Sequence, residues 1–77
     1  MPKRIFNEAE LTALAKRLRI RSGKNRAEAA RDLGVSRPSI FHAEESPKLS
    51  YLKLRKRMIE LYSGQKLVGP IYFLEEG

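Results

Sequence analysis

The chain contains no cysteine and only one histidine, His42. No disulfide can therefore support the fold, and an ordinary structural zinc site, which takes four Cys or His ligands, is excluded. Apolar residues never run for the ~20 positions that a membrane-spanning helix needs, and the first ten residues lack the apolar core of a signal peptide. We expect a soluble, cytoplasmic protein with no metal and no membrane partner.

Signatures of catalysis are missing as well. The sequence has no paired carboxylates, no glycine-rich phosphate loop and no nucleophile motif to work with His42. We therefore expect neither enzymatic activity nor a cofactor. The 77 residues make one small domain, for which oligomerisation is a common additional source of stability.

Positive charge is abundant. The chain has 16 Lys and Arg against 9 Asp and Glu, a net charge of +7, which favours a polyanionic partner. Part of this charge lies in an acid-free stretch that leads into the middle of the chain: Lys16, Arg17, Arg19, Arg21, Lys24 and Arg26. A second basic cluster, residues 53–57, is either a solvated helix face or a further contact surface.

The first helix has clear start and stop signals. Asn7 and Glu10 are spaced as a capping box, and Phe6 can pack onto Leu11 as a hydrophobic staple. Ser22 and Gly23 follow the last expected helical residue, Arg21. One apolar stripe recurs at helical spacing: Leu11, Leu14, Ala15 and Leu18. This pattern predicts a scaffold helix.

Two short helices are predicted around Gly34. Asn25 and Glu28 repeat the capping pattern, and glycine at 34 suits the left-handed conformation that ends a helix. Ser36 can cap the next helix, and Pro38 suits its first turn. The inner faces of the two helices and their turn are predicted to hold Ala29, Ala30, Leu33, Val35, Ile40 and Ala43. The small side chain of Ala30 leaves room for the second helix to pack closely.

This segment resembles the helix-turn-helix of the lambda repressor and Cro family of phage and bacterial regulators. The resemblance lies on Arg19, Ile20, Gly23, Asn25, Ala30, Leu33, Gly34, Val35, Ser36, Ile40 and Glu44. It implies a mostly α, four-helix lambda-repressor-like domain whose helix over about residues 37–45 enters the major groove of double-stranded DNA. It also implies a partly buried ion pair between Arg19 and Glu44.

The resemblance further implies which residues contact DNA. Arg37 is the strongest candidate, because a guanidinium can bond both acceptors of a guanine edge; a phosphate contact is the alternative. Phe41 and Pro38 could touch thymine methyl groups, although Phe41 could equally pack on the protein or on a partner subunit. The expected DNA contacts are Lys24, Asn25, Arg26, Ser36, Arg37, Pro38, Ser39, His42 and Lys48.

Two positions depart from the family pattern. Gln often occupies the position of Arg26, and an apolar residue that of Lys24. Both changes add positive charge at the amino-terminal end of the first short helix, where free amides and the helix dipole already favour a phosphate. These two changes favour general affinity for DNA over discrimination between base sequences.

A fourth helix is predicted from Ser50, its expected cap, to about Tyr62. Ser63 and Gly64 would end it. Its main apolar stripe is Tyr51, Leu54, Met58, Leu61 and Tyr62, while Leu52 and Ile59 form a second stripe that is either buried or free for a subunit contact.

The last segment, residues 65–77, reads as a single strand that would serve as a dimerisation arm. An unpaired apolar strand is sticky, so we expect it to pair with the same strand of a second copy; packing back onto its own helices is the alternative. The expected dimer contacts are Leu67, Val68, Ile71, Tyr72, Phe73 and Leu74.

These features favour a sequence-specific regulator that binds double-stranded DNA, most simply a repressor that occupies an inverted repeat as a homodimer. Residues 1–64 would form the DNA-binding domain. One alternative is an antitoxin or accessory factor whose tail is completed by a partner protein. Another is a protein-interaction or RNA-binding module that uses the same helices only for packing.

Overall fold

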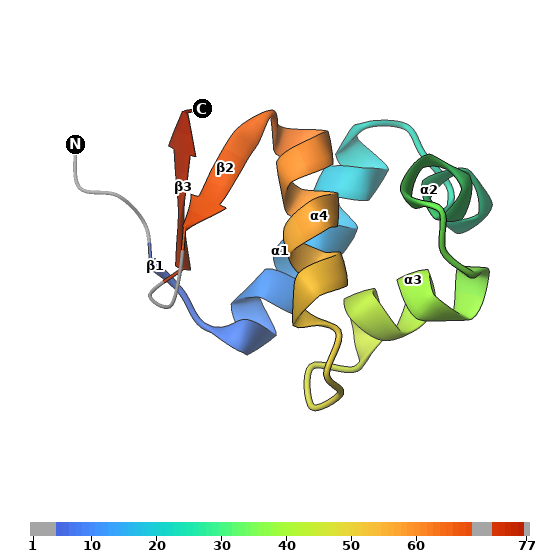
Figure 1. The fold of residues 1–77 in the computed structure, drawn as a ribbon, viewed down its shortest axis with the longest axis horizontal. Helices are drawn as coiled ribbons and strands as arrows, with labels where there is room; N and C mark the ends of the chain where they lie inside the picture. The colour runs from blue at the N-terminus through green and yellow to red at the C-terminus, as the bar shows by residue number, and fades with distance from the viewer. Residues whose placement is uncertain (1–4, 69–71, 77) are drawn as a thin grey trace.

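The computed structural model of the chain describes residues 5–68 and 72–76 and shows a mostly helical domain with a small sheet at one end (Figure 1). The elements in chain order are β1 (Ile5–Phe6), α1 (Glu8–Arg21), α2 (Arg26–Leu33), α3 (Arg37–Glu45), α4 (Leu52–Ser63), β2 (Gln65–Val68) and β3 (Tyr72–Glu76). Within the described residues, no helical segment combines the length and hydrophobicity that a bilayer crossing requires.

The predicted caps of the first two helices are confirmed. The Asn7 side chain accepts from the Glu10 N–H at 2.8 Å, and the Glu10 carboxylate accepts from the Asn7 N–H at 3.1 Å. Asn25 and Glu28 repeat this exchange at 2.8 and 3.0 Å. Each pair satisfies two backbone N–H groups at the start of its helix that have no partner within the helix. Short-range spacing alone therefore fixes where α1 and α2 begin.

The turn between α2 and α3 also follows its local sequence. Gly34 adopts φ +67°, a left-handed conformation that favours glycine, and the N–H of Val35 donates to the carbonyl of Ala30 at 3.0 Å. The hydroxyl of Ser36 then accepts from the N–H of Ser39 at 3.2 Å and caps α3. In Figure 1, α2 is seen nearly end-on while α3 runs across the view.

The core lies between α1, α4 and the inner faces of α2 and α3. Its buried apolar residues are Phe6, Leu11, Leu14, Ala15, Leu18, Ala29, Ala30, Leu33, Ile40, Ala43, Leu54, Met58, Ile59 and Leu67. Ile59 is fully buried and Leu52 packs against the core, so the second stripe of α4 is used inside the domain. Leu61, expected in the core stripe, is instead 52% exposed.

The expected start of α4 is wrong by one residue. Ser50 does not cap the helix; Tyr51 occupies the cap position, with no side-chain capping bond. The N–H of Tyr51 donates to the carbonyl of Leu49 at 2.9 Å, and its ring stacks on His42 with centroids 5.7 Å apart. A local turn and this contact with α3 therefore set where α4 begins.

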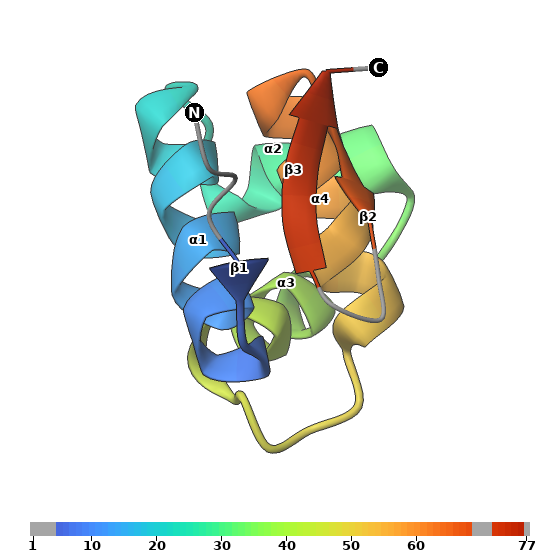
Figure 2. The same cartoon turned by 90° about the vertical axis from the view of Figure 1, so that its left-hand side faces the viewer.

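The expectation of a single C-terminal strand is also wrong. The segment contains two strands, and β3 lies between β1 and β2 in an antiparallel sheet of order β1-β3-β2 (Figure 2). β3 pairs Phe73 with Ile5 on one side and with Val68 on the other. Among the described residues, Leu74, Glu75 and Glu76 pair with β2 alone, so β3 is held within its own chain mainly along β2.

The residues expected at a dimer contact are accordingly distributed over this sheet. Leu67 is buried in the core at 1% exposure, and Val68 is half-buried. The N–H of Leu67 donates to the carboxylate of Glu60 at 2.9 Å, which ties β2 to α4. Tyr72, Phe73 and Leu74 belong to β3, and Ile71 lies outside the described residues.

Candidate nucleic-acid interface

Two arginines of α4 hold α2 and α3 by their carboxyl ends. Arg57 donates to the carbonyl of Leu33, the last residue of α2, at 2.8 Å. Arg55 donates to the carbonyls of Ala43 and Ser46 at the end of α3, at 2.9 and 2.6 Å. A cation at the carboxyl end of a helix satisfies open carbonyls and complements the helix dipole. These contacts fix how α2 and α3 sit on the domain.

Arg55 was not distinguished from its exposed neighbours in the sequence. It is only 1% exposed, and burial lowers the pKa of its guanidinium while the charge of Glu8 opposes that shift. In the basic cluster at residues 53–57, Arg55 and Arg57 bond backbone carbonyls, although Arg57 is exposed like Lys53 and Lys56.

Arg19 of α1 and Glu44 of α3 form the ion pair that the resemblance implies. The guanidinium donates to both carboxylate oxygens, at 2.5 and 3.0 Å, and the two side chains are 8% and 0% exposed. A third bond runs from Arg19 to the carbonyl of Lys24 at 2.7 Å. This buried, two-pronged contact joins α1, the loop before α2, and α3.

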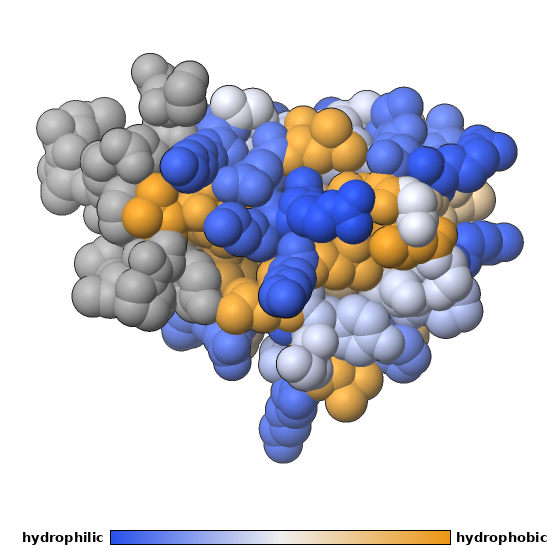
Figure 3. Space-filling view, in the orientation of Figure 1, coloured by the Kyte–Doolittle hydropathy of each residue, from blue (hydrophilic) through white to orange (hydrophobic). Residues whose placement is uncertain are grey.

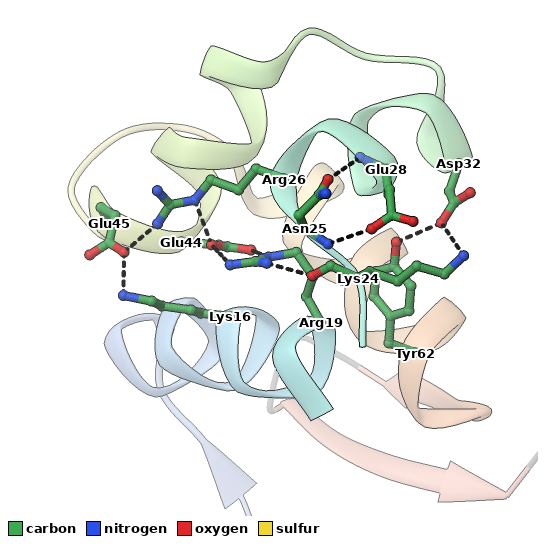
Figure 4. Close-up of polar contacts among 10 residues, drawn as sticks. All are labelled: Lys16, Arg19, Lys24, Asn25, Arg26, Glu28, Asp32, Glu44, Glu45 and Tyr62. Carbon is green, nitrogen blue, oxygen red and sulfur yellow. Dashed lines mark hydrogen bonds and ion pairs between the residues drawn. The ribbon is translucent and has the colours of Figure 1, made fainter. Parts of the chain in front are cut away.

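Arg26 is drawn into the same network (Figure 4). Its guanidinium donates to Glu44 at 3.1 Å and to Glu45 at 2.8 Å. Glu45 also pairs with Lys16 at 2.6 Å, and the bond from Lys16 is the main reason that the pKa of Glu45 lies below its usual value. The sequence predicts a phosphate contact for Arg26; in the structure its charge is already matched by two carboxylates.

The first turn of α3 is presented to solvent. Ser36, Arg37 and Pro38 are exposed and Ser39 is half-buried, its hydroxyl 2.8 Å from that of Ser36. Among the described residues, no group pairs with the guanidinium of Arg37. The three expected DNA contacts at positions 36–38 are therefore all exposed, and the charged side chain among them, Arg37, is available to a ligand.

His42 is less available than the sequence suggests. Its Nδ1 lies 3.2 Å from the hydroxyl of Ser46, and its ring stacks on Tyr51 with an interplanar angle of 27°. The ring of Phe41 meets it edge-on at 5.5 Å. The imidazole is thus packed on one side and half-exposed on the other, so only its Nε2 edge remains for a ligand.

The other predicted contact residues divide into engaged and open side chains. The side-chain oxygen of Asn25 accepts the capping hydrogen bond at the start of α2. Lys24 lies 3.8 Å from the carboxylate of Asp32, which also accepts a hydrogen bond from the Tyr62 hydroxyl at 3.0 Å. Lys48, in the loop after α3, is exposed. The amino-terminal end of α2 is therefore less open to a phosphate than its sequence indicates.

A shallow hollow beside α2 and α3 is lined by Arg26, Arg37, Pro38 and Phe41. Phe41 is 44% exposed, and the guanidinium of Arg26 lies 5.0 Å from its ring centroid. This cation–π contact keeps an apolar ring standing on the outward face of α3. The sequence left the role of Phe41 open between DNA, the protein body and a partner.

Positive charge covers more than one face. Several basic side chains pair with no carboxylate among the described residues: Arg17, Arg21, Arg31, Arg37, Lys48, Lys53 and Lys56. Hydrophilic residues spread over the face that α4 occupies, with apolar patches between them (Figure 3). In the same part of the chain, no group of three or more His, Cys, Asp or Glu is placed to hold a metal ion.

Comparison of the chain with models of protein families, with curated proteins and with solved structures finds no match.

Proposed function

We propose that the chain is a sequence-specific DNA-binding protein of the transcription-regulator class, most simply a repressor. In this proposal α2, the turn at Gly34 and α3 act as a helix-turn-helix, and α3 lies in the major groove of the duplex. The observation that carries the proposal is the exposed guanidinium of Arg37 in the first turn of α3, which pairs with no group in the part of the chain that the structure describes. A guanidinium fork bonds O6 and N7 of guanine together, which discriminates between bases by ~1–3 kcal/mol.

The support beneath Arg37 is rigid. Ser36 caps the amino end of α3, Arg55 holds its carboxyl end, and Glu44 ties its last turn to Arg19 of α1. A reading side chain needs such a scaffold, because a loose helix would lose the geometry on which a bidentate contact depends. The net charge of +7 supplies the sequence-independent attraction to phosphate.

A homodimer remains part of the proposal. A single reading helix spans few base pairs, whereas two related by a twofold axis lie about 34 Å apart and read an inverted repeat. Because β3, among the described residues, pairs with β2 from Phe73 to Glu76 and with β1 only at Tyr72 and Phe73, the contact between copies would use an edge or face of this sheet rather than a free tail.

The test is selection of bound duplexes from a random pool at two salt concentrations, with the mass of the complex measured alongside. We expect one inverted repeat, a complex of two chains on one duplex, and affinity that falls by about one log unit per log unit of salt for each phosphate contacted. A pool that is not enriched, or an affinity that ignores salt, would reject DNA reading. Enrichment of a half-site by a monomer would reject the dimer alone.

A further inference from the structure

The exposed ring of Phe41 is out of place on an ordinary solvated helix face. It is one of four large apolar side chains that are exposed within the described residues, the others being Ile20, Leu49 and Leu61. Of the four, only Phe41 lines the hollow that Arg37 also lines. An exposed aromatic ring and an arginine with no partner among the described residues therefore line one hollow, which indicates a ligand with both an apolar and a hydrogen-bonding edge.

The ring is held by a chain of contacts that begins on α1. Lys16 pairs with Glu45, Glu45 pairs with Arg26, and the guanidinium of Arg26 lies over the ring of Phe41. The edge of Phe41 also meets the ring of His42, which is itself stacked on Tyr51. Both neighbours of the ring are thus fixed by partners of their own. The network orients Phe41 before any ligand arrives, which lowers the entropy cost of using it.

Arg37 and Phe41 are four residues apart, so they lie on one face of α3 about one turn, or ~6 Å, apart along its axis. In the major groove the apolar group on a base edge is the 5-methyl of thymine, and the edge that suits a guanidinium fork is that of guanine. Successive base pairs rise by 3.4 Å, so two side chains one helical turn apart reach base pairs about two steps apart.

We infer that Phe41 is a specificity-determining residue that packs on the 5-methyl group of a thymine, within about two base pairs of a guanine bonded by Arg37. Arg26 is the positioning residue that holds the ring. The inference rests on the proposed function, because it names the base that the same helix reads.

The experiment compares thymine with uracil, which differ only by that methyl group. In the duplex recovered by selection, each thymine near the guanine is replaced in turn by deoxyuridine, and the dissociation constant is measured. Burial of one methyl group contributes ~0.8 kcal/mol, so we expect one position per half-site at which the replacement weakens binding about fourfold. For Phe41→Ala the thymine and uracil duplexes should bind equally.

Leu61→Ala is the matched control, since Leu61 is also an exposed apolar residue but lies on α4. Leu61→Ala should keep the fourfold difference in dissociation constant between the thymine and uracil duplexes. Phe41→Leu, which retains an apolar side chain, should keep part of it. A selected site without thymine, no thymine position sensitive to the replacement, or a full difference retained by Phe41→Ala would each overturn the inference while leaving DNA binding intact. Absence of any selected duplex would instead reject the proposed function, and the inference with it.

Arg26→Met separates positioning from phosphate binding. If Arg26 holds the ring, the variant brings the dissociation constants of the thymine and uracil duplexes closer together. The salt dependence of the affinity then stays nearly unchanged. If Arg26 contacts phosphate, both duplexes weaken equally and the slope of log affinity against log salt falls by about one. The second result would overturn the positioning role.

Discussion

Arg55 donates a hydrogen bond to the carbonyl oxygen of Ala43 at 2.9 Å, across the buried contact between α4 and α3. The same guanidinium also reaches the carbonyl of Ser46 at 2.6 Å. A buried cation therefore ends the helix that we propose as the DNA reader. Because both acceptors are backbone carbonyls rather than carboxylates, the contact serves helix termination and packing together.

Arg55→Met tests this contact. The variant leaves the carbonyls of Ala43 and Ser46 without their partner, and an unsatisfied buried group costs about 1–3 kcal/mol. We expect the free energy of unfolding in urea to fall by that amount. Lys56→Met, the same replacement at the exposed neighbouring position, should stay within about 0.5 kcal/mol of the parent. Equal stability of the two variants would show that the buried contact contributes nothing.

The helix starts that could be predicted from the sequence are those set by residues close together in the chain. Asn7 with Glu10, and Asn25 with Glu28, need only a spacing of three to form a capping box, so no tertiary information is required. The left-handed turn at Gly34 is local in the same sense. Where α4 begins is only partly local, because the turn at Leu49 acts together with the stacking of Tyr51 on His42 of α3.

The charged side chains show where such prediction stops. Lys53, Arg55, Lys56 and Arg57 are alike in the sequence, yet only Arg55 is buried, and only Arg55 and Arg57 bond carbonyls at the ends of other helices. Which of them bonds a carbonyl depends on which face of α4 meets α2 and α3. Apolar periodicity marks that face only coarsely, since an arginine can bury its stem and still place its guanidinium at a polar partner.

The sheet was missed for a related reason. β1 has only two residues, too few to show the alternation that identifies a strand, and its partner β3 lies at the other end of the chain. The ion pairs of Arg26 were missed for a similar reason, because its partners Glu44 and Glu45 follow it by 18 and 19 residues. The resemblance supplied the Arg19–Glu44 pair but not this extension of it.

Glu44→Gln should be among the most destabilising single changes in the chain. It removes the charge that compensates the buried guanidinium of Arg19, and stranding one partner of a buried pair costs roughly 3–5 kcal/mol. Urea unfolding provides the measurement. Glu45→Gln, at the exposed adjacent position, should cost far less, since exposed pairs contribute little. A double replacement, Arg19→Met with Glu44→Met, should recover most of the loss; failure to recover would contradict the stranded-charge explanation.

Tyr62 makes the stability of the domain depend on pH in the alkaline range. Burial, reinforced by the hydrogen bond and charge of Asp32, raises the pKa of the Tyr62 hydroxyl from 10.0 to about 12. Because the folded state holds this proton more tightly than the unfolded chain, the stabilisation is complete below pH 10 and is lost as the pH rises through about 12. Tyr62→Phe should therefore lose less stability than the parent over that interval in urea unfolding. Tyr51→Phe is the control and should follow the parent.

Arg37→Ala separates base reading from general attraction to DNA. If Arg37 bonds a guanine edge, the variant loses roughly 1–3 kcal/mol of discrimination against a duplex changed at that base pair, and the loss is confined to that position. Lys66→Ala removes one positive charge from β2, at the sheet end of the domain, and should leave discrimination unchanged. The measurement is the affinity of each variant for the selected duplex and for its single-base variants, at two salt concentrations. Should Arg37→Ala weaken all duplexes equally and lower the salt slope by about one, Arg37 would be a phosphate contact, and the reading of sequence would have to come from other side chains of α3.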